Sequence, residues 1–103
     1  MKFLMKVRMG DNLGNDRLKD PEFGHKMGEL LAEIKAEAAY FTTICGNRGA
    51  YVVVNMNDAS QMPKIAEPFY LWLNAEIEFI PVMSPEDLGK AGPDIAAAVK
   101  KWG

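Results

Sequence analysis

The sequence predicts an α+β domain in which helices cover one face of a four-stranded antiparallel sheet. Two observations support this fold class. Apolar and polar residues alternate over residues 2–9 and 76–82, the pattern of strands with one buried face. Apolar stripes at helical spacing lie on either side of a segment, 38–56, that is rich in β-branched and aromatic residues. At 103 residues, the chain is expected to form a single domain, residues 1–103.

The chain opens on a strand whose two faces differ. Phe3, Met5 and Val7 share the apolar face. Lys6 and Arg8 point to the opposite face. The following residues, 10–16, read GDNLGND, a composition typical of a turn, so a loop is expected there.

A first helix is predicted to begin at Asp20. Its side chain can accept hydrogen bonds from free backbone N–H groups, and Pro21 suits the first helical position. Its apolar stripe contains Phe23, Met27, Leu30, Leu31 and Ile34. His25, the only histidine, projects away from that stripe, so we interpret it as exposed and without function. A ligand or catalytic role would require a pocket beside the first turn of this helix.

Two strands, 38–45 and 50–56, follow as a hairpin with residues 46–49 as its loop. Pairing Cys45 with Ala50 places Cys45 on the apolar face, so it is interpreted as a small core residue and not as a nucleophile. The opposite face of the hairpin carries Tyr40, Thr42, Ile44, Tyr51, Val53 and Asn55.

Three further helices are predicted. Asp58–Gln61 resembles a capping box, and the helix after it runs to Leu73 with a kink or break at Pro68. Ser84 caps a short helix, and Pro93 opens the last one. The last helix carries the apolar residues Ile95, Val99 and Trp102.

The order strand, helix, strand, strand, helix, strand is the split βαβ pattern of ferredoxin-like domains. Right-handed crossovers then predict the strand order 4-1-3-2, with the 76–82 strand at an edge, where Pro81 is tolerated. One antiparallel register pairs Lys6 with Glu78 and Arg8 with Glu76. Each such pair contributes roughly 0.2–1 kcal/mol, so this register is favoured.

The second sheet face is too apolar to be left exposed to solvent and too polar to be buried in a hydrophobic core. It holds Leu4, Lys6, Arg8, Tyr40, Thr42, Ile44, Tyr51, Val53, Asn55, Glu76, Glu78, Ile80 and Val82. A mixed patch of this kind marks an interaction surface. We therefore predict a homodimer closed through the open sheet faces of two copies.

The charged residues of this face form the candidate site. Glu76 and Glu78 are the candidate catalytic residues, because a carboxylate whose pKa is raised by burial can act as a general base. Lys6 and Arg8 would stabilise a developing enolate. The ligand-binding set is Lys6, Arg8, Tyr40, Tyr51 and Asn55. The alternative is that the four charges are ion pairs at an interface and perform no chemistry.

Composition argues against several partner classes. A net charge of −2 with scattered basic residues predicts no nucleic-acid binding. Apolar runs fall short of the ~20 residues of a spanning helix, and residues 1–8 are too short and too charged for a signal peptide, so no membrane role is expected. One cysteine and one histidine supply no metal spacing. We expect no metal or cofactor, and a reducing, cytoplasmic location.

The chain resembles the dimeric α+β barrel superfamily over nearly its whole length. The resemblance rests on the element order, the opening strand MKFLMKVRM and the ending EFIPVMSPEDL with its trailing helix. Short bacterial proteins of this type, many without an assigned activity, have a similar ending. More distant similarity is to muconolactone isomerase and the antibiotic-biosynthesis monooxygenases.

The resemblance implies a homodimer that binds a small cyclic or aromatic molecule, as an isomerase or a cofactor-independent oxygenase. Muconolactone-isomerase-like chemistry implies a carboxylate base, a role that Glu76 or Glu78 could take. The superfamily hosts unrelated chemistries, so the alternative is a non-enzymatic dimeric binding or structural module.

Overall fold

A computed structural model describes the backbone of residues 1–103 and every side chain except those of Asp11 and Asn12. Four strands form one antiparallel sheet in the order β2-β3-β1-β4: β1 (Lys2–Arg8), β2 (Ala38–Ile44), β3 (Asn47–Asn55) and β4 (Glu76–Pro81). Read from the other edge, this order is 4-1-3-2. The α+β class and the strand order predicted from the sequence are therefore confirmed.

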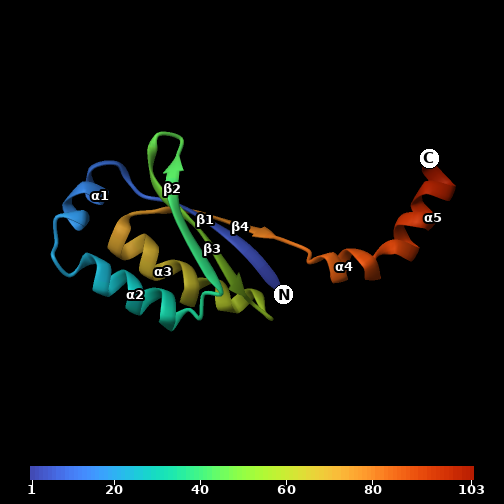
Figure 1. Cartoon of the computed structure of the whole chain (residues 1–103), viewed down its shortest axis with the longest axis horizontal. Coiled ribbons are helices and arrows are strands. Elements are labelled where there is room, and N and C mark those ends of the chain that lie inside the picture. Colours follow the sequence, from blue (N-terminus) through green and yellow to red (C-terminus); the bar gives the residue numbers. More distant parts are fainter.

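Two helices, α2 (Phe23–Glu33) and α3 (Met62–Leu73), lie on one face of the sheet (Figure 1). We call this the covered face and the other the open face. Met27, Leu30 and Ile34 of the predicted stripe are buried. The core between sheet and helices includes Met5, Val7, Val52, Val54, Ile65, Phe69 and Leu73.

Of the kink or break predicted at Pro68, the break does not occur, because helix α3 continues through that residue. Ile65 and Phe69, on either side of the proline, are both buried in the core. The predicted capping box of Asp58 and Gln61 is present at a short 3-10 helix, η1 (Ala59–Gln61), which leads directly into α3.

Residues 10–16 do not form the predicted loop; most of them belong to a helix, α1 (Asp11–Leu18). The composition of this segment disfavours a helix, and contacts distant in sequence stabilise it instead. The Arg17 Nε atom donates a hydrogen bond to the Trp72 carbonyl oxygen of α3 at 2.8 Å. This contact joins α1 to α3.

The β1–β4 register is the predicted one. Lys6 lies opposite Glu78, and Arg8 lies opposite Glu76. Pro81 is the last residue of β4, which is an edge strand, so its missing N–H group leaves no partner unsatisfied in the sheet interior.

The predicted β2–β3 register is wrong. Ala50 lies opposite Phe41 and not Cys45, a shift of four residues (45 − 41 = 4). Cys45 and Gly46 form a two-residue turn with φ angles of 49° and 80°. Turns with positive φ at both central residues match the twist of a hairpin. Cys45 is therefore exposed in the turn, which corrects its interpretation as a core residue.

Beyond β4 the chain leaves the body of the domain as two helices, α4 (Pro85–Lys90) and α5 (Gly92–Trp102), which project to one side (Figure 1). Ser84 caps α4 as predicted: the Asp87 N–H donates to its Oγ at 3.1 Å. The molecule is consequently elongated, with extents of 57 × 27 × 21 Å.

Candidate functional site

The strand registers arrange the predicted site residues in rows across the open face. Lys6 of β1 lies opposite Tyr51 on one side and Glu78 on the other, and Tyr51 lies opposite Tyr40 of β2. One row therefore contains Tyr40, Tyr51, Lys6 and Glu78. The next row contains Thr42, Gly49, Arg8 and Glu76. Six of the seven predicted site residues thus lie in two adjacent rows.

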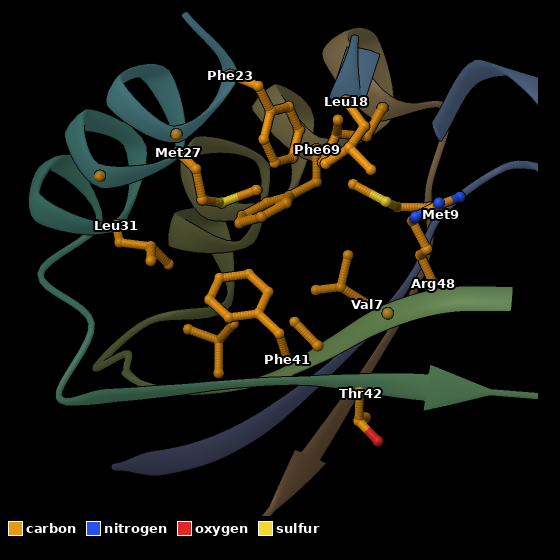
Figure 2. A pocket seen from close by; sticks show the side chains of 16 residues that line it. Val7, Met9, Leu18, Phe23, Met27, Leu31, Phe41, Thr42, Arg48 and Phe69 are labelled. Atoms are coloured by element: carbon orange, nitrogen blue, oxygen red, sulfur yellow. The ribbon is translucent and has the colours of Figure 1, made fainter. Parts of the chain in front are cut away.

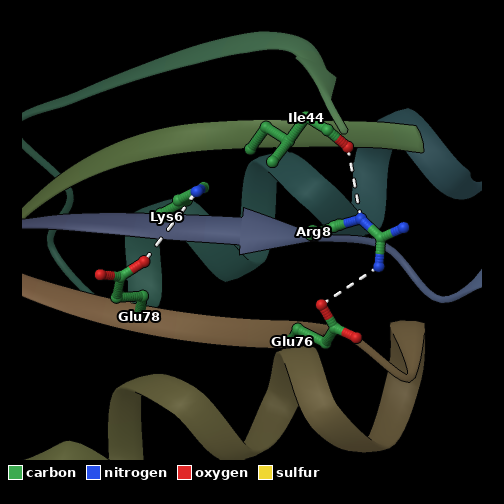
Figure 3. A network of polar contacts seen from close by, with 5 residues as sticks. All are labelled: Lys6, Arg8, Ile44, Glu76 and Glu78. Atoms are coloured by element: carbon green, nitrogen blue, oxygen red, sulfur yellow. Dashed lines mark hydrogen bonds and ion pairs between the residues drawn. The ribbon is translucent and has the colours of Figure 1, made fainter. Parts of the chain in front are cut away.

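The two glutamates are held differently (Figure 3). The Arg8 Nη1 atom donates to Glu76 Oε2 at 3.1 Å, and its Nε atom donates to the Ile44 carbonyl oxygen at 3.3 Å. The Lys6 Nζ atom is 4.0 Å from Glu78 Oε2, at the outer limit of an ion pair. Glu78 is therefore the more weakly held carboxylate.

The charges surround a hollow of about 240 Å³ on the open face. Its lining residues are Lys6, Arg8, Ile44, Cys45, Glu76, Ile77 and Glu78. The side chains of Glu76 and Glu78 are 74% and 64% exposed, so a single copy of the chain does not enclose either carboxylate.

Sequence reasoning missed Ile44 and Cys45 as residues of this hollow. Their position depends on the two-residue turn, which brings the end of β2 beside Arg8. The local signal for that turn is Gly46, one residue beyond the β-branched run Thr42–Ile44, because glycine accepts the positive φ angle of a hairpin turn.

Asn55 does not join the other predicted site residues. It lies opposite Lys2, four residues along β1 from Lys6, a separation of about 13 Å at the usual strand rise. Its Nδ2 atom donates to Glu37 Oε1 at 2.5 Å, and the Lys2 Nζ atom lies 2.9 Å from Glu37 Oε2. Asn55 belongs to a second polar cluster, Lys2–Glu37–Asn55, whose central carboxylate sequence reasoning did not single out.

This second cluster predicts a pH dependence of stability. Hydrogen bonds from Lys2 and then Asn55 lower the pKa of Glu37 below its ordinary value of 4.5. A depressed pKa in the folded state contributes stability above pH 4.5, and that contribution is lost as pH falls through the folded value. We expect the Glu37→Gln variant to lose less stability than the wild type between pH 6 and pH 3.

Urea unfolding followed at several pH values measures this difference. Glu33→Gln, at an exposed carboxylate of α2, is the matched control and should follow the wild type. Parallel stability profiles for Glu37→Gln and the wild type would contradict the assignment.

A larger cavity, of about 510 Å³, lies on the covered face between α2 and β2. We call it the apolar groove (Figure 2). Its lining residues are Val7, Met9, Leu18, Phe23, Gly24, Met27, Gly28, Leu31, Phe41, Thr42, Arg48, Gly49, Ala50, Val52, Phe69 and Leu73. Phe41 points from β2 toward the helices yet remains 62% exposed, because the helices do not fully cover this edge of the sheet. The apolar character of Phe41 was predicted, but its exposure was not.

Comparison with known proteins assigns no family. No protein-family model matches this chain, and no curated protein matches it either. The functional assignment therefore depends on the residues of the open face and their geometry.

Within the described residues, no group of three or more His, Cys, Asp or Glu side chains is arranged to hold a metal ion. Among the described helices, none is long and apolar enough to cross a bilayer. His25 is exposed, as expected, and its Nε2 atom lies 2.8 Å from Glu29 Oε1.

Proposed function

We propose that this chain is a ferredoxin-like domain of the dimeric α+β barrel type, which pairs with a second copy through the open face and binds a small cyclic or aromatic molecule between the two sheets. The observation that carries the proposal is the row Tyr40, Tyr51, Lys6 and Glu78 on a sheet face that no helix covers. Aromatic rings, an ammonium group and a carboxylate lie next to one another in that row.

A third row, on the other side of the Lys6 row from Arg8, supports the dimer. Val53, Leu4 and Ile80 lie side by side on the open face, each only partly buried in a single copy. An apolar strip of this kind is stabilised when another surface removes it from water. Two sheets pack about 10 Å apart, and a second sheet at that distance would close the hollow beside Lys6 and Glu78.

The residues of the hollow suggest the chemistry of the ligand. Its two cations, Lys6 and Arg8, balance its two anions, Glu76 and Glu78, so a neutral molecule fits better than a strongly charged one. Beside the hollow, in the same row as Lys6, the rings of Tyr40 and Tyr51 offer a surface for a planar ring. The Lys6 ammonium can donate to a carbonyl oxygen. A cyclic ketone, lactone or phenol has these features.

Proton transfer is the reaction that this arrangement supports best. Glu78 would remove a proton from the carbon beside the ligand carbonyl, and the electron pair of that C–H bond would move to the oxygen as an enolate. Lys6 would stabilise the enolate oxygen. In a ligand with a double bond between its β and γ carbons, return of the proton from Glu78 to the γ carbon brings the double bond into conjugation with the carbonyl and completes an isomerisation. In a ligand without that double bond, return of a proton to the same carbon exchanges its hydrogen with the solvent. The second sheet would exclude water from the Glu78 carboxylate and from the bound ligand.

A non-enzymatic binding module is the second candidate, and the ion pairs favour it. Arg8 holds Glu76 at 3.1 Å, and Lys6 lies near Glu78, so the four charges can serve only to set the register of two paired sheets. This candidate shares the dimer and the ligand with the first and differs only in the absence of proton transfer.

The compound 2-tetralone, a bicyclic ketone with acidic hydrogens beside its carbonyl, is a probe that separates the candidates. Wild-type protein should bind 2-tetralone, and binding should change the NMR chemical shifts of the backbone amides around Lys6 and Tyr51. In D₂O the wild type should also catalyse exchange of the α-hydrogens of 2-tetralone for deuterium. Glu78→Gln should retain binding and lose exchange by about 10²-fold or more, because a positioned general base contributes on that scale. Glu67→Gln, at an exposed carboxylate of α3, should behave as the wild type.

Binding without exchange in the wild type would support the binding module and end the isomerase assignment. Two results together would contradict both candidates. They are unchanged NMR chemical shifts of the open-face amides at millimolar 2-tetralone and a monomeric mass by light scattering.

A further inference from the structure

The C-terminal arm, residues 82–103, ends in two helices that bury no residue against the rest of the described chain. Neither α4 nor α5, both fully described, contains a buried residue. The radius of gyration is 17.1 Å, whereas a compact domain of about 100 residues has a value near 13 Å. The arm, seen at the far side of Figure 1, accounts for the difference.

The arm nevertheless carries the surface of a buried helix. Ile95, Val99 and Trp102 recur at intervals of four and three residues, so they share one face of α5. They are 48%, 63% and 79% exposed, and Leu88 of α4 is 50% exposed. Ala97 lies on the opposite face. A one-sided apolar helix of this kind is stabilised by packing against another apolar surface.

The apolar groove is an unfilled surface of the same character. Gly24 and Gly28 form part of its wall on α2, and a Cβ atom added at either would meet no atom within 4 Å. Each glycine costs the helix about 1 kcal/mol relative to alanine. In return, glycines without side chains let another helix approach the backbone of α2 closely.

The arm and the groove lie at opposite ends of the domain. The arm begins beside Lys2, where the Val82 N–H donates to the Lys2 carbonyl oxygen at 3.1 Å, at the β4 edge. The groove borders β2 at the other edge and includes Val7 and Met9 at the far end of β1. Helix α2 forms a wall of the groove, whereas the arm projects from the other side of the domain (Figure 1). A chain therefore cannot easily place its arm in its own groove.

We propose that the arm docks in the apolar groove of a second copy of this chain, with the stripe Leu88, Ile95, Val99 and Trp102 facing Phe41 and the glycines of α2. A two-fold axis makes the exchange reciprocal, so each arm fills the other groove. The exchange forms two equivalent contacts, and each contact removes one apolar stripe and one apolar groove from water. This exchange is separate from the sheet-face contact and does not depend on the ligand.

Chemical cross-linking between two different variants tests the exchange in the full-length chain. Cys45, the only cysteine, is first changed to serine. A Phe41→Cys chain mixed with a Val99→Cys chain should form a covalent dimer with a short bismaleimide. A Phe41→Cys chain mixed with an Ala97→Cys chain should give at least tenfold less, because Ala97 faces away from the stripe.

A change on the groove side provides the second test. Gly28→Leu, made in the Phe41→Cys chain, fills the groove wall and should reduce the cross-link to Val99→Cys at least tenfold. It should not lower the melting temperature, since leucine favours a helix more than glycine does. Loss of the cross-link in a folded chain then reports groove blockage and not unfolding.

Two results would overturn the proposal. One is equal cross-linking of Val99→Cys and Ala97→Cys to Phe41→Cys. The other is a cross-link that forms only within a single chain carrying both Phe41→Cys and Val99→Cys, which would mean that the arm folds back on its own domain. Neither result depends on whether the open faces pair or bind 2-tetralone, so failure here is distinguishable from failure of the proposed function.

Discussion

Replacing Phe69 with alanine is expected to lower the free energy of unfolding by about 3–5 kcal/mol. Phe69 comes from α3 and is 1% exposed in the core between helices and sheet. Its removal takes away buried apolar surface and leaves a cavity that the surrounding strands cannot close. Domains of this size have only ~5–15 kcal/mol of stability in total, so the midpoint of urea unfolding should fall markedly.

Leu71, two residues later in the same helix, supplies the matched control. It is 78% exposed, and Leu71→Ala should change the free energy of unfolding by no more than about 0.5 kcal/mol. The two variants remove a large apolar side chain from one helix but from opposite sides of it. Equal losses of stability would show that α3 does not present Phe69 to the sheet.

Replacing Gly49 with alanine is expected to lower the free energy of unfolding by about 1–3 kcal/mol. Gly49 lies in β3 opposite Arg8 of β1 and Thr42 of β2. A Cβ atom there would lie 2.6 Å from Ile44 Cδ1 and 2.7 Å from the Val7 carbonyl oxygen. Ile44 can change its rotamer, but the backbone oxygen of Val7 cannot move without disturbing the ladder.

Gly28→Ala provides the contrast, because it makes the same chemical change in open space. With no atom within 4 Å of its Cβ, alanine should raise the free energy of unfolding by about 1 kcal/mol through its better helix propensity. Opposite signs for the two alanine variants are the expected outcome in thermal or urea unfolding. A stabilised Gly49→Ala would show that the strand register around Val7 and Ile44 is different.

The register of the open-face charges was predictable from the sequence alone. Lys6 and Arg8 are two residues apart on β1, as Glu76 and Glu78 are on β4, and only one antiparallel alignment pairs both at once. Charge adds a constraint to the apolar alternation, and the two together favour the observed register over those shifted by two residues.

The hairpin lacked such a constraint. Sliding β2 along β3 by an even number of residues keeps every side chain on its own face, so periodicity accepts several registers. The backbone at Cys45 and Gly46 decides among them, through two positive φ angles that local sequence indicates only weakly. The exposure of Cys45 and its place beside the charged hollow followed from that turn.

The helix α1 and the separation of Asn55 from the other candidate residues also depended on distant contacts. Arg17 reaches the Trp72 carbonyl oxygen, a bond between segments 55 residues apart. Asn55 shares the predicted face but lies at the other end of it, where it donates to Glu37, the carboxylate that also pairs with Lys2. Face membership was predictable, whereas position along the face required the complete pairing of the strands.

The sequence by itself determined which side chains share a face, where the helices capped by Asp58 and Ser84 begin and which charges pair across β1 and β4. It did not determine the start of α2, which begins at Phe23 without a side-chain cap and not at Asp20 as predicted. Periodicity, capping and charge complementarity are local or pairwise properties, so they can be recognised in the chain without coordinates. The tertiary structure alone decided which surfaces lack a partner: the exposed edge at Phe41, the apolar groove and the projecting arm. Exposure depends on the packing of all elements together, and no single segment contains that information.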